Sequence, residues 1–316
     1  VGPIPMNRDD KRRLSAAVTH LYPVTSRANL TVRGDAPVDR VLFAGSRATG
    51  VRLVDGSTLE AGRVLLCAGV LHTPLVLLRS GIGPADALRA QDIEVLVDQP
   101  GVGRHWTDHM VIQLSTPIDE SLVRPGARGI QVLARLTAPD SPFSNDLQIT
   151  PWCERTGKDA YQLNLSVSLQ QPFGEASVSL ASADPSARGD FAWLFPSEPR
   201  NIERLRFGHR TAVRLLSASG VSVDTEGLAR ADARSDEEID RWIGEQHGAF
   251  YHGVGSCRMG KDEASPIDLE LAVRGTEDLF VIDGASIPRV SRSNTHIVIA
   301  ALAERAAAML SGREAL

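Results

Sequence analysis

Two histidines stand in settings suited to proton transfer. His252 lies in the glycine-rich segment Tyr251-His252-Gly253-Val254-Gly255, and His296 stands near the start of a helix predicted over residues 295–310. Histidine ordinarily titrates near neutrality, so it can accept or release a proton at physiological pH. Glycine carries no side chain, so the backbone beside His252 can approach a ligand closely. Both histidines are therefore candidates for acid–base chemistry.

A third segment joins a buried strand to a turn that could bind a ligand. Residues 279–282 are apolar, and Asp283-Gly284 follows them directly. Ligands of doubly wound α/β folds bind at the carboxyl ends of such strands. The alternative is an ordinary β-turn without a ligand.

The first hundred residues predict the α/β elements that would carry this site. Strands are expected at 30–33, 38–43 and 50–54, with Asp55-Gly56 as a hairpin turn. Residues 64–68 are apolar throughout, which is typical of a parallel strand buried on both faces. Short helices are expected after that strand.

The middle of the chain has a different texture. Residues 162–169 and 177–180 alternate polar and apolar side chains, which predicts antiparallel strands with one wet face. A helix is expected over residues 199–219, and Ser235-Asp236-Glu237-Glu238 is a capping box that opens another.

Composition excludes several classes of protein. The 316 residues are 42% hydrophobic and 23% charged, which predicts one large globular domain or two packed ones. A net charge of −5 without a long like-charge run argues against a nucleic-acid surface. Cys67, Cys153 and Cys257 form no CxxC motif, so we expect neither a disulfide scaffold nor a zinc site, but a reducing, cytoplasmic compartment. No apolar run approaches the ~20 residues of a membrane span, and no secretory signal is visible.

The order and spacing of these motifs resemble the glucose–methanol–choline (GMC) family of FAD-dependent oxidoreductases. Besides the three segments above, the resemblance includes Gly69-Val70-Leu71-His72-Thr73-Pro74 and Pro100-Gly101-Val102-Gly103, and it covers nearly the whole chain. Val70 departs from the small residue or proline that is usual in the family. The resemblance to this family implies an α/β fold, with the remainder of a Rossmann-like FAD-binding domain at 1–108 and 265–316. Residues 109–264 would form an α+β substrate domain with an antiparallel sheet.

The resemblance implies FAD-dependent oxidation of a small alcohol to a carbonyl, as in choline dehydrogenase-like enzymes. A hydride would pass to flavin N5, and the hydroxyl proton would need a base. The family places its paired active-site residues at His252 and His296. His252 would be the base, and His296 would hydrogen-bond and orient the alcohol oxygen. Electrons would pass on to oxygen, a quinone or another acceptor.

The resemblance also assigns five residues to FAD. Backbone at Ile297 and Val298, in the first turn of the last helix, would touch the N1 and C2 edge of the ring, where the helix dipole favours negative charge. Asp283 and Gly284 would lie at the pyrophosphate and ribityl chain. Val38 matches the family valine whose backbone faces the adenine.

The remaining histidines and Cys257 have plainer interpretations. His20, His209 and His247 are expected to be structural, and His72 occupies a variable motif position. His105 and His109 suggest a zinc pair, but no third ligand is nearby in sequence and Asp108-His109 resembles a family turn, so no metal is expected. Cys257 is expected to be structural.

The printed sequence contains no G-x-G-x-x-G loop to cradle the FAD pyrophosphate. Gly81-Ile82-Gly83 and Gly101-Val102-Gly103 both lack the third glycine. We therefore expect a C-terminal portion that lacks the N-terminal FAD-binding βαβ segment, whether as a fragment, a split subunit or a truncated product. Such a chain would bind FAD weakly and could need a complementary N-terminal chain.

Two other functions remain open. One is a non-catalytic remnant or partner subunit, and the weaker one is a hydroxynitrile-lyase-like activity on the same fold. Flavin reduction by alcohols would separate oxidation from both. The substrate is not identified by the sequence, although Gln148, Trp152 and Phe250 are candidates to line its site.

Overall fold

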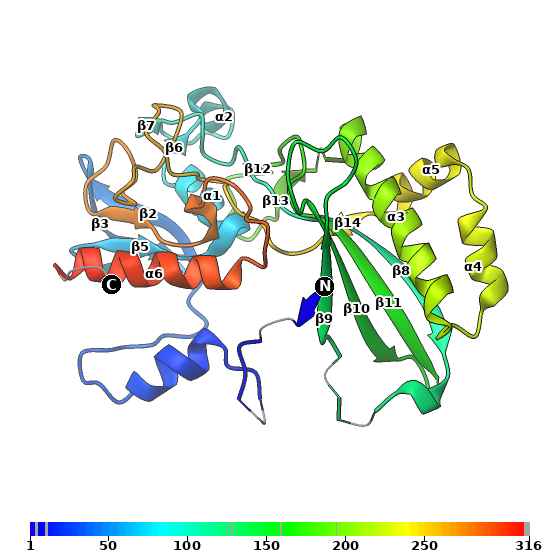
Figure 1. Ribbon diagram of the computed structural model, residues 1–316. Coiled ribbons are helices and arrows are strands. Elements are labelled where there is room, and N and C mark those ends of the chain that lie inside the picture. The colour runs from blue at the N-terminus through cyan, green and yellow to red at the C-terminus, as the bar shows by residue number, and fades with distance from the viewer. Residues whose placement is uncertain are drawn as a thin grey trace.

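The chain folds into two lobes (Figure 1). The computed structural model describes residues 1–3, 6–9, 12–124, 126–127, 129–158, 160–193 and 195–312. One lobe, on the right of Figure 1, is built on a long antiparallel sheet, and the other carries short sheets and the last helix. We call them the sheet lobe and the cofactor lobe.

The sheet lobe has six strands in the order β1-β9-β10-β11-β8-β14, and every pair is antiparallel. Helices α3 and α5 pack against this sheet, and α4 packs on α3 (Figure 1). Its elements are β1 (Gly2–Pro3), β8 (Met110–Ile118), β9 (Val132–Leu136), β10 (Leu147–Arg155), β11 (Tyr161–Leu169), α3 (Pro199–Ser219), α4 (Thr225–Asp232), α5 (Asp236–Gln246) and β14 (Gly248–Ala249).

Apolar side chains of β11 pack against helix α3. Leu165, Val167 and Leu169 of β11 are buried toward α3. A Cβ added at Gly208 of α3 would lie 2.5 Å from Cγ1 of Val167, so glycine permits this close packing. The predicted strand at 162–169 and helix at 199–219 are confirmed. The wet face predicted for this strand is wrong, because its polar residues Asn164, Ser166 and Ser168 are at most 5% exposed. The predicted capping box is also confirmed, because Ser235 and Glu238 exchange side-chain to backbone hydrogen bonds at the start of α5.

The cofactor lobe combines a three-stranded antiparallel sheet with two parallel pairs of strands, β5–β15 and β6–β7. The predicted strands at 38–43 and 50–54 are found in the three-stranded sheet β2-β3-β4, and the strand predicted at 64–68 is present as β5, which pairs in parallel with β15. Its elements are β2 (Val38–Ala44), β3 (Arg47–Leu53), β4 (Thr58–Glu60), β5 (Val64–Leu66), α1 (Gly69–Arg79), β6 (Ile82–Gly83), α2 (Ala85–Arg89), β7 (Val97–Asp98), β15 (Leu279–Val281) and α6 (His296–Leu310).

Two predictions about this lobe are wrong. Residues 30–33 form no strand, and Val32 is 60% exposed, because a β-prone run becomes a strand only when another strand pairs with it. Residues 64–68 are not buried on both faces. Only Val64 and Leu66 are buried in β5, whereas Leu65 is 47% exposed, because β5 pairs only with β15 and nothing described covers its other face.

The segment at 177–192 lies closer to the cofactor lobe than its place in the sequence suggests. The predicted strand at 177–180 is present as β12 (Ser177–Leu180), but it pairs only with β13 (Gly189–Ala192) in a separate hairpin. A Cβ added at Gly189 would touch the side chain of Leu75 in α1 at 2.9 Å, so this hairpin packs on the cofactor lobe. The domain boundaries inferred from the sequence remain a prediction.

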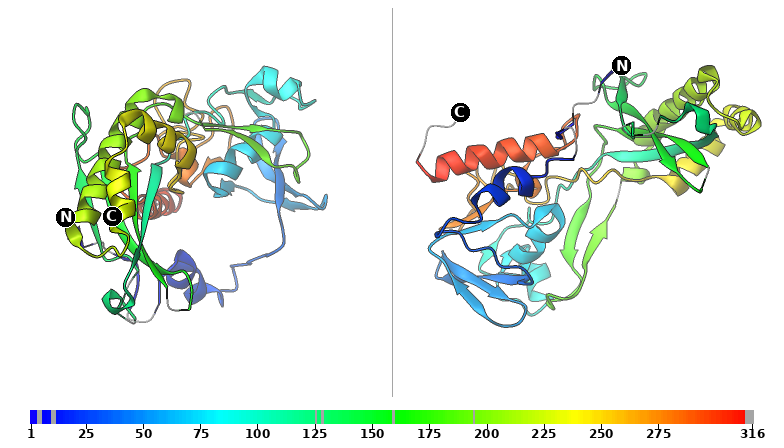
Figure 2. Two further views of the ribbon diagram at one scale, coloured as in Figure 1. Left: turned by 90° about the vertical axis from the view of Figure 1, so that its right-hand side faces the viewer. Right: turned by 90° about the horizontal axis from the view of Figure 1, so that it is seen from below.

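The N-terminal segment links both lobes. Strand β1 pairs with β9 of the sheet lobe, and the following residues run beside α6 (Figure 2). A hydrogen bond of 3.2 Å between His20 Nε2 and Glu304 Oε1 fixes this segment along α6. None of the helices in the described part of the chain is long and apolar enough to cross a membrane.

Candidate active site

The segments that carry the two histidines meet at the Asp283–Gly284 turn. Main-chain hydrogen bonds join Gly255 N to Gly284 O at 3.0 Å and Cys257 N to Ala285 O at 2.9 Å. A Cβ added at Gly284 would lie 3.3 Å from the carbonyl oxygen of Gly253 and 3.4 Å from Cδ1 of Ile299, one turn into α6. The predicted turn therefore lies between the His252 segment and the start of α6.

Glycine at position 255 is required by the backbone. Gly255 has a φ of +93°, and a Cβ there would lie 2.7 Å from the carbonyl oxygen of His105. Both conditions exclude ordinary side chains. This glycine lets the segment turn tightly between β14 and the Asp283–Gly284 turn.

Asp108 holds the backbone of His252 from below. Its Oδ1 accepts hydrogen bonds from the main-chain N–H groups of His252 at 2.9 Å and His109 at 2.6 Å. Asp108 is 2% exposed. Burial raises the pKa of its carboxyl to about 6, although the two N–H donors act in the opposite direction.

The ring of His252 packs against two side chains. Its Nδ1 lies 2.9 Å from Nδ1 of His109, and the two rings meet edge to face at 4.9 Å and 81°. The ring of Phe250 lies 4.9 Å away on an edge contact. Burial lowers the pKa of His252, so its neutral form is favoured. Nε2 of His252 makes no hydrogen bond within the described part of the chain.

His296 has a more open environment. It is the first residue of α6 and is exposed, and its Nε2 lies 3.4 Å from Nδ2 of Asn7. Among the described residues no hydrogen bond joins the rings of His252 and His296. The structure thus brings their segments together without a direct contact between the two side chains.

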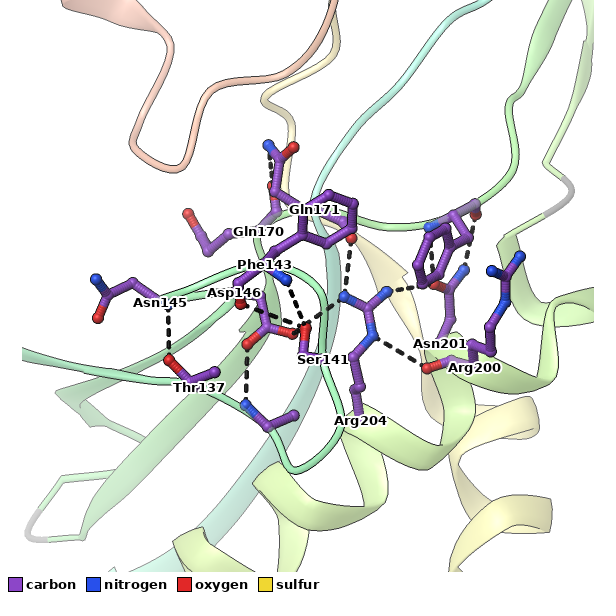
Figure 3. A network of polar contacts seen from close by, with 12 residues as sticks. Thr137, Ser141, Phe143, Asn145, Asp146, Gln170, Gln171, Arg200, Asn201 and Arg204 are labelled. Carbon is purple, nitrogen blue, oxygen red and sulfur yellow. Dashed lines mark hydrogen bonds and ion pairs between the residues drawn. The ribbon is translucent and has the colours of Figure 1, made fainter.

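A network in the sheet lobe positions the loop that leads to His296 (Figure 3). The buried Arg204 donates to Oδ2 of Asp146 and to the carbonyl oxygen of Gln171, both at 3.0 Å. The side chain of Gln171 in turn donates to the carbonyl oxygen of Val290 at 2.6 Å. The loop between β15 and α6 is therefore anchored on the sheet lobe.

The residues predicted to contact FAD fall into three environments. Ile297 is 71% exposed and Val298 is half-buried in the first turn of α6, and Gly284 lies next to Ile299 of the same helix. Val38 begins β2, on a different sheet from the histidines. The carboxylate of Asp283 is almost fully engaged, because it accepts hydrogen bonds from Gly69 N, Thr73 Oγ1 and Ala285 N at 2.6–2.8 Å.

Asp283 therefore acts on the protein itself. It caps the start of α1, and burial raises the pKa of its carboxyl despite the three donors. A free carboxylate beside a pyrophosphate would be repelled, whereas one bound to α1 shapes the turn. The assignment of Asp283 to FAD binding through its position remains a prediction.

The start of α6 suits an anionic ring edge. No side chain caps this helix at Thr295, whereas Asp224 and Ser235 cap α4 and α5. The first N–H groups of α6 thus lack a side-chain cap, next to the exposed Ile297. These residues fit the N1 and C2 edge of a flavin.

The sequence did not identify Asp108 and His109 as parts of this site. Residues 107–111 pair with 248–254 through bridges of Thr107 with Val254 and Val111 with Gly248, which brings both side chains to His252. The only local signal was the adjacent Asp-His pair. His105, the suggested zinc partner of His109, instead hydrogen-bonds Glu175 at 2.7 Å. The described residues include no group of three metal-binding side chains.

Other candidates lie outside the immediate site. Of the three suggested lining residues, Phe250 contacts the ring of His252. Trp152 donates to Ser166 Oγ and Gln148 to Thr150 Oγ1, both at 3.0 Å within the sheet. Cys257 is fully buried, and burial raises the pKa of its thiol strongly, which suits a structural role.

Comparisons with known proteins identify relatives over the whole chain. The chain is 30% identical to an uncharacterised GMC-type oxidoreductase of Rhodococcus erythropolis, over 99% of this chain and 63% of the relative. It is 29% identical to choline oxidase of Arthrobacter globiformis, over 98% of this chain and 60% of that protein. The crystal structure of pyridoxine 4-oxidase from Mesorbium loti superposes with a TM-score of 0.81 at 23% identity, covering 99% of this chain and 64% of the other.

Two family models, both described as GMC oxidoreductase, match residues 1–111 and 172–303. Because residues 1–111 match the model for the N-terminal part of the family, the prediction that this N-terminal part is lacking is not borne out. The absence of one phosphate-cradling loop from the sequence was too narrow a criterion. The relatives also give no support for a complementary N-terminal chain. This chain spans about three fifths of the relatives' length, and it belongs to the GMC oxidoreductase family, whose cofactor is FAD.

Proposed function

We propose that this protein oxidises the CH–OH group of a small alcohol to a carbonyl with FAD, and that His252 accepts the hydroxyl proton. The observation that carries the proposal is the environment of His252. Its backbone is fixed on Asp108, one ring nitrogen is occupied by His109, and the other has no partner in the described chain. Such a nitrogen is available to a ligand.

The protonation state of His252 supports this role. Burial lowers its pKa below the ordinary value, so the ring is neutral at physiological pH and can take up a proton. A base that is already deprotonated loses no activity to competing protonation near neutrality.

The start of α6 would hold the flavin beside this base. Backbone at Ile297 and Val298, at the start of this helix, would face the ring edge. Bound FAD supplies the hydride acceptor. His296, exposed on the same turn, would donate or accept a hydrogen bond at the alcohol oxygen and so orient its carbon.

The relatives suggest which alcohols to test first. Among them are proteins named choline oxidase, pyridoxine 4-oxidase and aryl-alcohol oxidase. We propose a primary alcohol of this general kind as substrate and oxygen as one electron acceptor. Choline, pyridoxine and benzyl alcohol are therefore suitable probes.

The test is anaerobic stopped-flow reduction of the flavin-loaded protein by the best of these alcohols. His252→Ala should slow reduction by roughly 10²–10⁴-fold, the usual contribution of a positioned proton acceptor. His20→Ala, at an exposed histidine whose hydrogen bond is to Glu304 and not to His252, serves as the matched control and should react at the wild-type rate. Reduction of His252→Ala at the wild-type rate would refute the proposal.

A further inference from the structure

His109 is a fully buried histidine with a defined partner on each ring nitrogen. Its Nε2 lies 2.8 Å from the carbonyl oxygen of Ser291, and its Nδ1 lies 2.9 Å from Nδ1 of His252. The ring is 0% exposed. The Ser291 carbonyl, His109 and His252 are therefore linked in series by hydrogen bonds.

The chemistry of these partners allows one assignment of protons. A carbonyl oxygen can only accept, so His109 must carry its proton on Nε2. The neutral ring then has a lone pair on Nδ1, which must accept. His252 must therefore carry a proton on Nδ1 and donate it to His109, which leaves Nε2 of His252 as the nitrogen with the free lone pair.

We propose that His109 is a positioning residue that fixes His252 in the Nδ1–H tautomer and so directs its basic nitrogen, Nε2, toward the substrate. The inference rests on the proposed role of His252 as the base. Uptake of a proton at Nε2 leaves the Nδ1–H donor unchanged. The bond to His109 therefore persists through proton transfer and keeps the ring oriented.

A neutral partner has a different effect from the carboxylate that orients histidine in serine proteases. A carboxylate would stabilise the protonated ring and raise its pKa, whereas neutral imidazole orients the ring without a charge. His109 stays neutral because burial and the neighbouring His252 lower its pKa to about 3. The charged groups that face the pair are the buried Asp108, bound to both backbones, and Arg135, which also disfavours a cation at His109.

The backbone next to the Ser291 carbonyl, the first group in this series of hydrogen bonds, is itself held in place. Ser291 follows Val290, whose carbonyl oxygen accepts from Gln171 at 2.6 Å and whose N–H donates to Thr107 Oγ1 at 3.1 Å. The network around Arg204 in Figure 3 anchors Gln171. The sheet lobe thus sets the direction of the Ser291 carbonyl, and through His109 the tautomer of His252.

Nitrogen-15 NMR of histidine-labelled protein tests the inference without reference to activity. Long-range proton–nitrogen couplings distinguish the two tautomers of each ring, and the spectra of His252→Ala and His109→Gln assign the signals. We expect His252 as the Nδ1–H form and His109 as the Nε2–H form at neutral pH. His252 as the Nε2–H form, or as a mixture, would overturn the proposal.

Substitutions at His109 give a second readout. His109→Leu removes the acceptor and should produce a tautomer mixture at His252, with flavin reduction slowed roughly 10- to 100-fold. This loss is smaller than the roughly 10⁴-fold loss in a serine protease whose catalytic histidine is held entirely in the wrong tautomer. His109→Gln retains an acceptor and a donor, so it should preserve the Nδ1–H form and more of the rate. A pure Nδ1–H form in His109→Leu, or equal losses in both variants, would contradict the positioning role.

The two proposals fail in different ways. If His252→Ala keeps the wild-type rate, His252 is not the base, whatever tautomer the spectra show. If His252→Ala loses the rate while wild-type His252 is a tautomer mixture, the base assignment stands and the role of His109 is refuted.

Discussion

The two histidine-bearing regions differ in how firmly the chain itself holds them. His252 is fixed by Asp108 at its backbone and by His109 at its ring, and its segment is tied to the Asp283–Gly284 turn. His296 is exposed at an uncapped helix start, with one long contact to Asn7. The difference shows that the protein holds the proposed base in place through its own contacts, whereas the side chain of the proposed orienting residue is free to adjust to a ligand.

The largest effect is expected from removing the carboxylate beneath His252. Asp108→Ala leaves two buried N–H groups without an acceptor and should lower the free energy of unfolding by about 3 kcal/mol. Asp108→Asn retains an acceptor oxygen and should cost markedly less. Denaturant unfolding of both variants measures the difference, and equal costs would show that the carboxylate does not fix this backbone.

An added side chain at Gly255 tests how tightly the backbone of the same region is packed. Gly255→Ala combines a positive φ with a clash against the His105 carbonyl and should cost roughly 2–3 kcal/mol. Gly220→Ala is the matched control, because Gly220 has a φ of +65° but nothing within 4 Å of an added Cβ. It should cost about 1 kcal/mol. A Gly255→Ala variant as stable as the control would mean that the segment shifts freely.

Acid should destabilise the protein through His109. Its folded pKa of about 3 lies below the ordinary 6.5, so protonation favours the unfolded state, and the stability present above pH 6.5 is lost as the pH falls toward 3. At pH 5 the loss amounts to about 2 kcal/mol. The His109→Gln variant should therefore lose about 2 kcal/mol less than the wild type between pH 7 and pH 5 in urea unfolding.

The buried Asp108 works in the opposite sense. Its raised pKa means that acid protonates it more readily in the folded state. This contribution is present in both proteins and largely cancels in the comparison. Identical acid losses in the two proteins would argue against a buried neutral His109.

Substitutions at His296 should have the smallest effect on stability. Because the side chain is exposed, His296→Ala should change the free energy of unfolding by less than about 0.5 kcal/mol. His296→Asn can still hydrogen-bond an alcohol oxygen and should retain more flavin-reduction rate than His296→Ala. Equal flavin-reduction rates in the two variants would contradict the orienting role of His296. A large loss of stability in His296→Ala would contradict the statement that His296 is held less firmly than His252.

Local patterns predicted elements well where the signal lies within one segment. The alternation at 162–169, the apolar periodicity of α3 and the capping box at Ser235 all describe interactions between near neighbours. Residues 30–33 failed because a strand depends on a partner that the segment does not specify. The prediction that Leu65 is buried also failed, because its burial depends on an element that covers this face of β5, and the segment itself does not specify one.

The site was only half visible in the sequence. The motifs around His252 and His296 made both histidines candidates, but the partners of His252 are more than 140 residues away in the chain. Their proximity arises from the antiparallel pairing of 107–111 with 248–254, which no local pattern encodes. Asp283 shows the converse, since its motif drew attention while its carboxylate proves to cap α1.

The pH dependence of flavin reduction by the alcohol tests the central claim, a neutral His252 that accepts the proton, most directly. Since the pKa of His252 is lowered, and it is faced by His109, Asp108 and, through His109, Arg135, the rate should rise with pH through an apparent pKa below 6.5 and then stay level. In His252→Ala this acidic limb should disappear together with most of the rate. A wild-type rate that rises only above about pH 8, or an acidic limb that persists unchanged in His252→Ala, would contradict the account.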